Sequence, residues 1–123
     1  MSKPKKKILI VCNDEKNQSL LSSILSKREL SIIKAQSKEK AVELAEKDNP
    51  DLIIYDFDIS DFNGGDMASA IRRKRPNRKI PIVFITSLVS EAEQKCRLLD
   101  GPICFLSKPL IVKKLLEEID NLL

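Results

Sequence analysis

Three short runs of apolar residues, each rich in β-branched side chains, constrain the fold of this chain more than any other feature. They are Ile8–Cys12, Leu52–Tyr55 and Ile82–Ile85. Their apolar residues are continuous and do not alternate with polar ones, which indicates strands that are covered on both faces, as in a parallel sheet. Two weaker candidates, Ser31–Ala35 and Ile103–Leu106, complete the set of expected strands.

Segments with apolar residues at helical spacing follow each of these strand candidates. Their apolar stripes lie within Leu20–Leu25, Ala41–Ala45, Met67–Ile71, Ala92–Leu99 and Leu110–Ile119. Strands that alternate with helices predict an α/β fold of five βα units, a doubly wound parallel sheet with helices on both faces and strand order 2-1-3-4-5. We expect one domain over residues 1–123, with a basic, flexible segment at residues 1–6 and no output domain in this chain.

Composition excludes several classes of function. The chain has no histidine and only three cysteines at uneven spacing, so we expect neither a zinc site nor Ser-His or Cys-His catalysis. No apolar run approaches the length of a membrane span, and we expect a cytoplasmic protein without a membrane partner. The net charge is +4, but no nucleic-acid-binding motif accompanies the basic residues, so direct nucleic-acid contact is not expected.

Polar residues with complementary chemistry end three of the expected strands. Asp56 follows the third strand, Thr86 ends the fourth and Lys108 follows the fifth. In the predicted topology these strands are neighbours, and ligands bind beside the carboxyl ends of such strands. An aspartate can accept a phosphoryl group as an acyl phosphate, while an ammonium and a hydroxyl neutralise the phosphoryl oxygens. Each residue alone is more often a turn or surface residue, and it is their combination that favours phosphoryl transfer.

The same segments resemble the receiver domain of two-component response regulators over the whole chain. The resemblance lies in Pro50–Asp56, Asn63–Gly65, Pro81–Thr86 and Phe105–Pro109. It implies that Asp56 accepts a phosphoryl group from a sensor histidine kinase or a phosphotransfer protein. It further implies a cis Lys108–Pro109 peptide bond, a bound Mg²⁺, and a chain that is no enzyme beyond assisting its own phosphorylation and dephosphorylation.

The resemblance also implies how the signal leaves the site. Thr86 would move toward the phosphoryl group and Phe105 would move inward behind it. These two switch residues would repack the face made by the fourth helix, the fifth strand and the fifth helix. That face would then bind a downstream protein or a second copy of the chain.

One departure from the family pattern concerns the metal. Cys12 and Asn13 stand where the family usually has two adjacent acids that hold magnesium. The remaining candidate ligands are Asp56, Asn13 and the backbone carbonyl of Asp58, with Asp14 as a further candidate. Mg²⁺ prefers hard anionic oxygens and a thiol is a soft ligand, so we expect weak Mg²⁺ binding.

Two other functions are compatible with parts of the sequence. A pseudo-receiver, an interaction module that works without phosphate, is favoured by Cys12 and Asn13. A phosphatase of the haloacid-dehalogenase type is suggested by Asp56 and Asp58, since that family uses an Asp-x-Asp motif. It is disfavoured because that motif belongs on the first strand and needs a further acidic motif after its lysine. Nucleotide binding is weaker still, because the three glycines form no phosphate loop.

Overall fold

The computed structural model describes residues 5–56, 64–74, 79–97, 99 and 101–123. Its elements are β1 (Lys6–Cys12), α1 (Glu15–Leu25), β2 (Leu30–Ala35), α2 (Lys38–Asp48), β3 (Leu52–Asp56), α3 (Gly64–Lys74), β4 (Ile82–Thr86), α4 (Val89–Cys96), β5 (Ile103–Ser107) and α5 (Val112–Leu122). The five strands form one parallel sheet in the order β2-β1-β3-β4-β5, which confirms the predicted topology. The predicted flexible terminus falls largely on residues 1–4, which lie outside the described residues.

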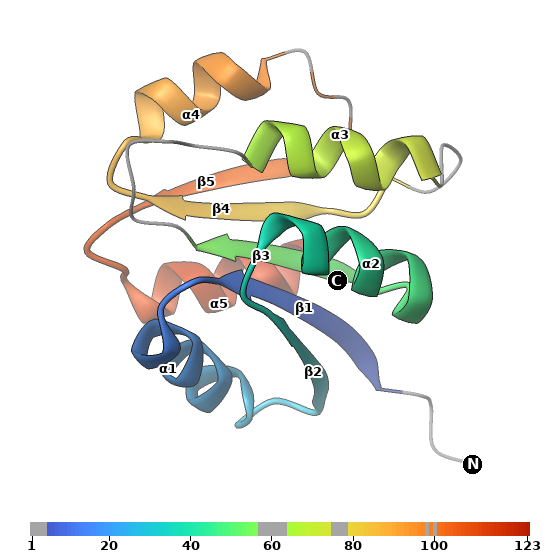
Figure 1. Cartoon of the computed structure of the whole chain (residues 1–123). Coiled ribbons are helices and arrows are strands. Elements are labelled where there is room, and N and C mark those ends of the chain that lie inside the picture. Colours follow the sequence, from blue (N-terminus) through green and yellow to red (C-terminus); the bar gives the residue numbers. More distant parts are fainter. Residues whose placement is uncertain (1–4, 57–63, 75–78, 98, 100) are drawn as a thin grey trace.

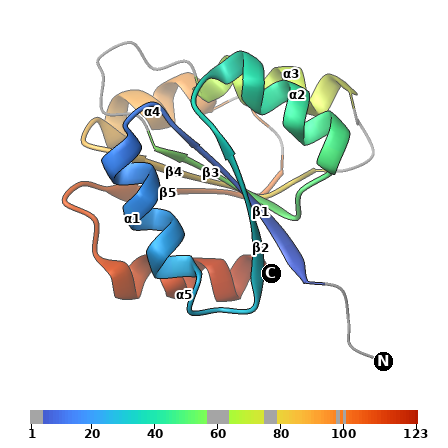
Figure 2. The same ribbon diagram turned by 60° about the horizontal axis from the view of Figure 1, so that its bottom comes forward.

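The sheet has a helical layer on each face (Figures 1 and 2). One layer, α2, α3 and α4, packs on residues such as Leu9 and Val11 of β1. The other layer, α1 and α5, packs on Ile8 and Ile10. Neighbouring residues of a strand point to opposite faces, so a central strand with both faces covered must be apolar throughout. This is why the sequence is continuously apolar over Ile8–Cys12 of β1, Leu52–Tyr55 of β3 and Ile82–Ile85 of β4, where every residue is buried.

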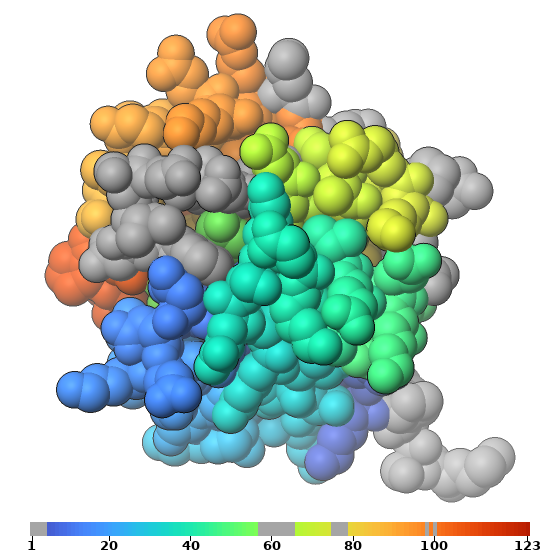
Figure 3. Space-filling model, viewed as in Figure 1, coloured from blue at the N-terminus to red at the C-terminus, as the bar shows by residue number. Residues whose placement is uncertain are grey.

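Local signals set the start of α1, at the carboxyl edge of the sheet, and the end of α2, just before β3. Asp14 is the N-cap of α1: its Oδ1 accepts hydrogen bonds from the backbone N–H groups of Lys16, at 2.8 Å, and Asn17, at 3.3 Å. Asn49 ends α2 in the left-handed conformation at φ 49°, which asparagine tolerates better than most residues. The space-filling view shows α2 beside α3 at the surface (Figure 3).

The amide of Gln18 joins the first two strands at this same edge. Its side chain is buried, and Nε2 donates to the carbonyl oxygens of Cys12 at 3.4 Å and Ala35 at 3.1 Å. A residue of α1 therefore fixes the ends of both β1 and β2.

No helix in the described part of the chain combines the length and apolar character needed to cross a membrane.

Candidate phosphoacceptor site

The carboxylate of Asp56 and the ammonium of Lys108 form a close ion pair at the carboxyl edge of the sheet. Lys108 Nζ lies 2.7 Å from Asp56 Oδ1, and the two side chains are 18% and 6% exposed. Asp56 is the last residue of β3 and Lys108 directly follows β5, so the pair joins residues 52 positions apart in the chain. At this distance and burial the attraction is much stronger than that of a surface ion pair.

The backbone around Lys108 continues the ladder between β4 and β5. Thr86 pairs with Ser107 in the register, and the next residue, Lys108, donates its backbone N–H to the Thr86 carbonyl at 3.1 Å. The Lys108–Pro109 peptide bond is cis, as the family resemblance predicts. Leu106 is the residue of β5 level with Asp56, so the lysine side chain starts two residues beyond the end of β3 and makes its contact with the Asp56 carboxylate from there.

Thr86 supplies a buried hydroxyl at the end of β4. The residue is 2% exposed, and its Oγ1 accepts a hydrogen bond from the backbone N–H of Leu88 at 3.0 Å. That bond uses an oxygen lone pair, so the hydroxyl hydrogen can be donated to another acceptor. Asp56 pairs with Ile85 in the β3–β4 register, which places Thr86 one position along the neighbouring strand.

A pocket of about 330 Å³ opens beside the ion pair, between α1 and the segment that joins β5 to α5. Asp56 and Lys108 contribute its charged groups. The rest of the lining is Asn17, Leu20, Leu21, Ile85, Pro109 and Leu110. A small anionic group that enters this pocket meets the lysine and the carboxylate together, while its walls are mainly apolar.

The end of β1 contributes no charge to the site. Cys12 is the register partner of Asp56 and is 1% exposed. Its Sγ lies 3.4 Å from the carbonyl oxygen of Asp14, to which the thiol donates. Burial raises the pKa of the Cys12 thiol above its ordinary value, with a smaller opposing effect from that hydrogen bond. The thiol is therefore neutral near pH 7.

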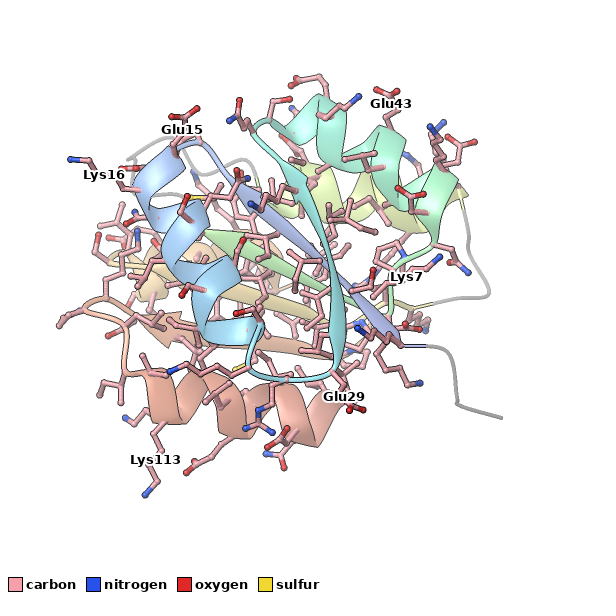
Figure 4. The ribbon with its side chains drawn as sticks, turned by 90° about the horizontal axis from the view of Figure 1, so that it is seen from below. Lys7, Glu15, Lys16, Glu29, Glu43 and Lys113 are labelled. Atoms are coloured by element: carbon pink, nitrogen blue, oxygen red, sulfur yellow. The ribbon has the colours of Figure 1, made fainter. Side chains whose placement is uncertain are left out.

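The described residues offer few anionic ligands for magnesium. None of the described Cys, Asp and Glu side chains gather in a group of three that could hold a metal ion. Asn13 is exposed, and Asp14 uses its carboxylate to cap α1. Glu15 and its neighbour Lys16 point away from the sheet (Figure 4). Asp58, whose backbone carbonyl is a predicted ligand, lies outside the described residues.

Phe105, the predicted switch residue, lies in β5 and packs against the core beneath α2, α3 and α4. Its ring is partly buried and stacks on Phe84. The structure thus brings Asp56 and Lys108 into contact and puts Thr86 on the adjacent strand, while Phe105 lies in the next strand. The chemical roles of these residues stay predictions.

Sequence reasoning missed two contributors to this edge. Leu20 reads as part of an apolar helical stripe, but its side chain is 56% exposed beside the pocket. The sequence pattern alone did not distinguish it from Leu21, which is 1% exposed, because successive residues can both belong to an apolar helical stripe. Gln18 gave no such signal, since its buried amide depends on carbonyls that only the folded sheet brings together.

Comparisons with known proteins agree with this geometry. The model of the response regulator receiver domain matches residues 8–120. The polar-differentiation response regulator DivK of Brucella ovis is 25% identical over 118 residues, which cover 96% of each chain. The DivK of Brucella anthropi is 24% identical over the same length.

Solved structures show the same fold. The chemotaxis protein CheY4 of Vibrio cholerae superposes with a TM-score of 0.85 at 24% identity, covering 98% of this chain and 100% of that chain. The receiver domain of the sensor histidine kinase PA1611 of Pseudomonas aeruginosa superposes with a TM-score of 0.80 at 21% identity, covering 96% and 97% of the two chains. That structure has a magnesium ion coordinated in its active-site cleft.

Proposed function

This chain belongs to the response regulator receiver domain family, and on that premise we propose that Asp56 accepts a phosphoryl group from a sensor histidine kinase or a phosphotransfer protein. The observation that carries the proposal is the 2.7 Å contact between Lys108 Nζ and Asp56 Oδ1 beside an open pocket. A buried carboxylate that faces a fixed cation has both the nucleophile and the charge that phosphoryl transfer requires.

The step uses the residues of the chain as follows. An oxygen of the Asp56 carboxylate attacks the phosphorus of a phosphohistidine, the P–O bond forms and the P–N bond breaks. The electron pair of the broken bond stays on the imidazole of the donor, which takes up a proton. Lys108 pairs with one phosphoryl oxygen, and the Thr86 hydroxyl donates its hydrogen to another. The phosphoryl group stays on the chain, so the domain is a phosphoacceptor that assists its own phosphorylation and dephosphorylation.

Magnesium has a weaker role here than its place in the PA1611 receiver domain suggests. The described residues offer one carboxylate at the site, and that carboxylate already pairs with Lys108. Loss of anionic ligands lowers the affinity for a hard cation. We therefore propose weak Mg²⁺ binding and assign no step of the transfer to the metal.

A protein donor must reach Asp56 through the pocket, because its side chain is 6% exposed. Leu20, which lines the pocket, is 56% exposed, and Ile111 and Val112, which follow the lining residue Leu110 in the chain, are 53% and 42% exposed. They give a donor protein apolar surface to bury beside the reacting atoms. The output passes through the face of α4, β5 and α5 to a downstream protein or a second copy of the chain. Such a signalling role fits a location in the cytoplasm.

The second candidate function is that of a pseudo-receiver, which binds partners without phosphorylation. The observation that favours it is the neutral, buried thiol of Cys12 at the position next to Asp56. The phosphatase alternative is not proposed, because Asp56 ends the third strand of the fold and that motif belongs on the first.

One experiment separates the two candidates. The protein is incubated with phosphorylated donor protein, or with a small acyl phosphate and Mg²⁺, and its intact mass is measured. We expect the gain of one phosphoryl group, loss of that group with hydroxylamine, and no gain for Asp56→Asn. Asp66→Asn is the matched control, since Asp66 is an exposed residue in the first turn of α3 and should leave the gain unchanged. No gain from either donor, with the fold intact, supports the pseudo-receiver.

A further inference from the structure

The aromatic residues of the described structure form a single row across three adjacent strands. Tyr55 of β3 is the register partner of Phe84 in β4, and Phe84 is the register partner of Phe105 in β5. The other two aromatic residues of the chain, Phe57 and Phe62, lie outside the described residues. Register partners on neighbouring strands point to the same face of the sheet, so the three rings lie side by side.

The rings contact one another in sequence along the row. The Tyr55 and Phe84 centroids are 5.8 Å apart with an interplanar angle of 65°, an edge-to-face contact. The Phe84 and Phe105 centroids are 5.1 Å apart at 17°, a stacked contact. Both geometries are those that aromatic pairs prefer. Tyr55 is 2% exposed and Phe84 is fully buried, so two of the three rings are fixed by the core and only Phe105 reaches the surface.

The contact with Phe84 favours one of the two places that the Phe105 ring can occupy. Against the core, the ring loses water contact and stacks on a neighbour that cannot move away. If the ring turned outward, it would lose both its burial and its stacking contact with Phe84. Phenylalanine has no hydroxyl that hydrogen bonds with water could draw toward solvent, which distinguishes it from tyrosine at the same position.

We propose that Phe84 is the positioning residue for Phe105, and that the row Tyr55–Phe84–Phe105 holds the β5 aromatic against the core before any phosphoryl group arrives. The surface of α4 and β5 is then already in the arrangement that an inward Phe105 produces. The positioning proposal rests on the proposed function in one respect, which is that it takes the surface of α4 and β5 as part of the output face. Phosphorylation of Asp56 changes the position of this ring less than the loss of Phe84 does.

The test follows the Phe105 ring by NMR in protein labelled on its phenylalanine rings. The four phenylalanines of the chain make assignment by substitution practical. In the native protein without phosphodonor we expect cross-peaks between the rings of Phe84 and Phe105, and a Phe105 shift displaced from its unfolded value. In Phe84→Leu the displaced population of the Phe105 ring should rise about fivefold, the factor that corresponds to the loss of one aromatic pair.

The matched control is Val83→Ala, in the same strand but on the face toward α1 and α5. It should lower stability without moving the Phe105 signals. If Phe84→Leu acted only by destabilising the fold, Val83→Ala would move the Phe105 signals as well. The native spectra keep the test decisive should Phe84→Leu fail to fold. Absence of Phe84–Phe105 cross-peaks in the native protein, or a Phe105 ring that ignores Phe84→Leu, overturns the proposal.

The same spectra separate this proposal from the proposed function. Asp56→Asn cannot form the acyl phosphate and should keep the Phe105 signals of the native protein. Adding phosphodonor to the native protein should shift Phe105 by less than Phe84→Leu does. A chain that takes up no phosphoryl group but keeps the ring contact refutes phosphorylation alone. A large inward movement of Phe105 on phosphorylation refutes the positioning role alone.

Discussion

The two halves of the carboxyl edge of the sheet share one scaffold and differ in charge. At the ends of β3 and β5 a carboxylate and an ammonium lie 2.7 Å apart. At the end of β1, one strand away from Asp56, the buried side chain is the neutral thiol of Cys12. Parallel neighbouring strands lie about 4.8 Å apart, so both halves are within direct electrostatic reach of one another.

This contrast separates two tasks in the proposed function. We propose that binding of the phosphoryl group depends on Asp56, Lys108 and Thr86. Binding a divalent cation depends on additional carboxylates, for which the β1 end is the available place. Here the ammonium of Lys108 already compensates the single carboxylate. We therefore propose that this chain performs the first task more effectively than the second.

The largest effect should come from removing the cation of the charged half. In Lys108→Met, the buried Asp56 carboxylate loses its ion pair with Lys108. We expect phosphorylation to slow by at least about 100-fold, the usual cost of losing a group that stabilises developing charge. Stability should fall by about 2 kcal/mol, less than for a fully buried pair because Lys108 is 18% exposed.

Urea denaturation and the time course of mass gain measure these two effects. The double variant Asp56→Asn with Lys108→Met should recover most of the lost stability, because it leaves no unpaired charge. Equal stability of the native protein and Lys108→Met would show that the ion pair does not form in solution.

The next test places a carboxylate at the end of β1, so that both halves of the edge are charged. In Cys12→Asp a second carboxylate lies beside Asp56, and like charges at this distance repel. Without divalent cation we expect the unfolding midpoint to fall by about 5 °C. Millimolar Mg²⁺ should restore much of this loss, and phosphorylation should become dependent on Mg²⁺.

The control for this variant is Cys12→Asn, which introduces a polar group of similar size without charge. Its midpoint should not respond to Mg²⁺ at constant ionic strength. Calorimetric scans with and without Mg²⁺ provide the measurement. A saturable Mg²⁺ response of the native protein at submillimolar concentration would contradict the neutral character assigned to the β1 end.

Thr86 should contribute less than Lys108 to the charged half. In Thr86→Val the N–H of Leu88 loses its acceptor, which costs about 1 kcal/mol of stability. The phosphoryl group also loses a hydroxyl donor, so we expect a roughly tenfold slower mass gain. Thr86→Ser retains the hydroxyl and should stay near the native rate; a Ser variant as slow as the Val variant would exclude the hydroxyl as the cause.

The smallest expected effect is a change in the pH dependence of stability, and it comes from Cys12 in the neutral half. Because burial raises the pKa of Cys12, the folded state holds the thiol proton more tightly than the unfolded state. Stability from this source is complete below the ordinary thiol pKa of about 8.5 and is lost as pH rises above it. The fall in unfolding free energy between neutral and alkaline pH should therefore be smaller in Cys12→Ser than in the native protein. An identical pH dependence of the two proteins would refute the shift.

The sequence predicted the fold and the charged half more fully than the neutral half. Strand order and the meeting of Asp56 with Lys108 follow from apolar periodicity and the rules of parallel sheets, which any reader of the chain can apply. The aromatic row was not predicted, because Tyr55, Phe84 and Phe105 are far apart in sequence and only the strand register aligns them. Likewise, Asp14 looks like a spare metal ligand until its capping bonds to the start of α1 are seen.

The buried amide of Gln18 has a practical consequence for engineering this domain. It binds backbone oxygens of Cys12 and Ala35 and touches neither side chain through those bonds. These two bonds to the ends of the first two strands therefore do not require a particular side chain at position 12. Residue 12 can therefore be substituted to tune the dependence on ions. We expect the backbone at position 12 to keep its place in the substituted protein.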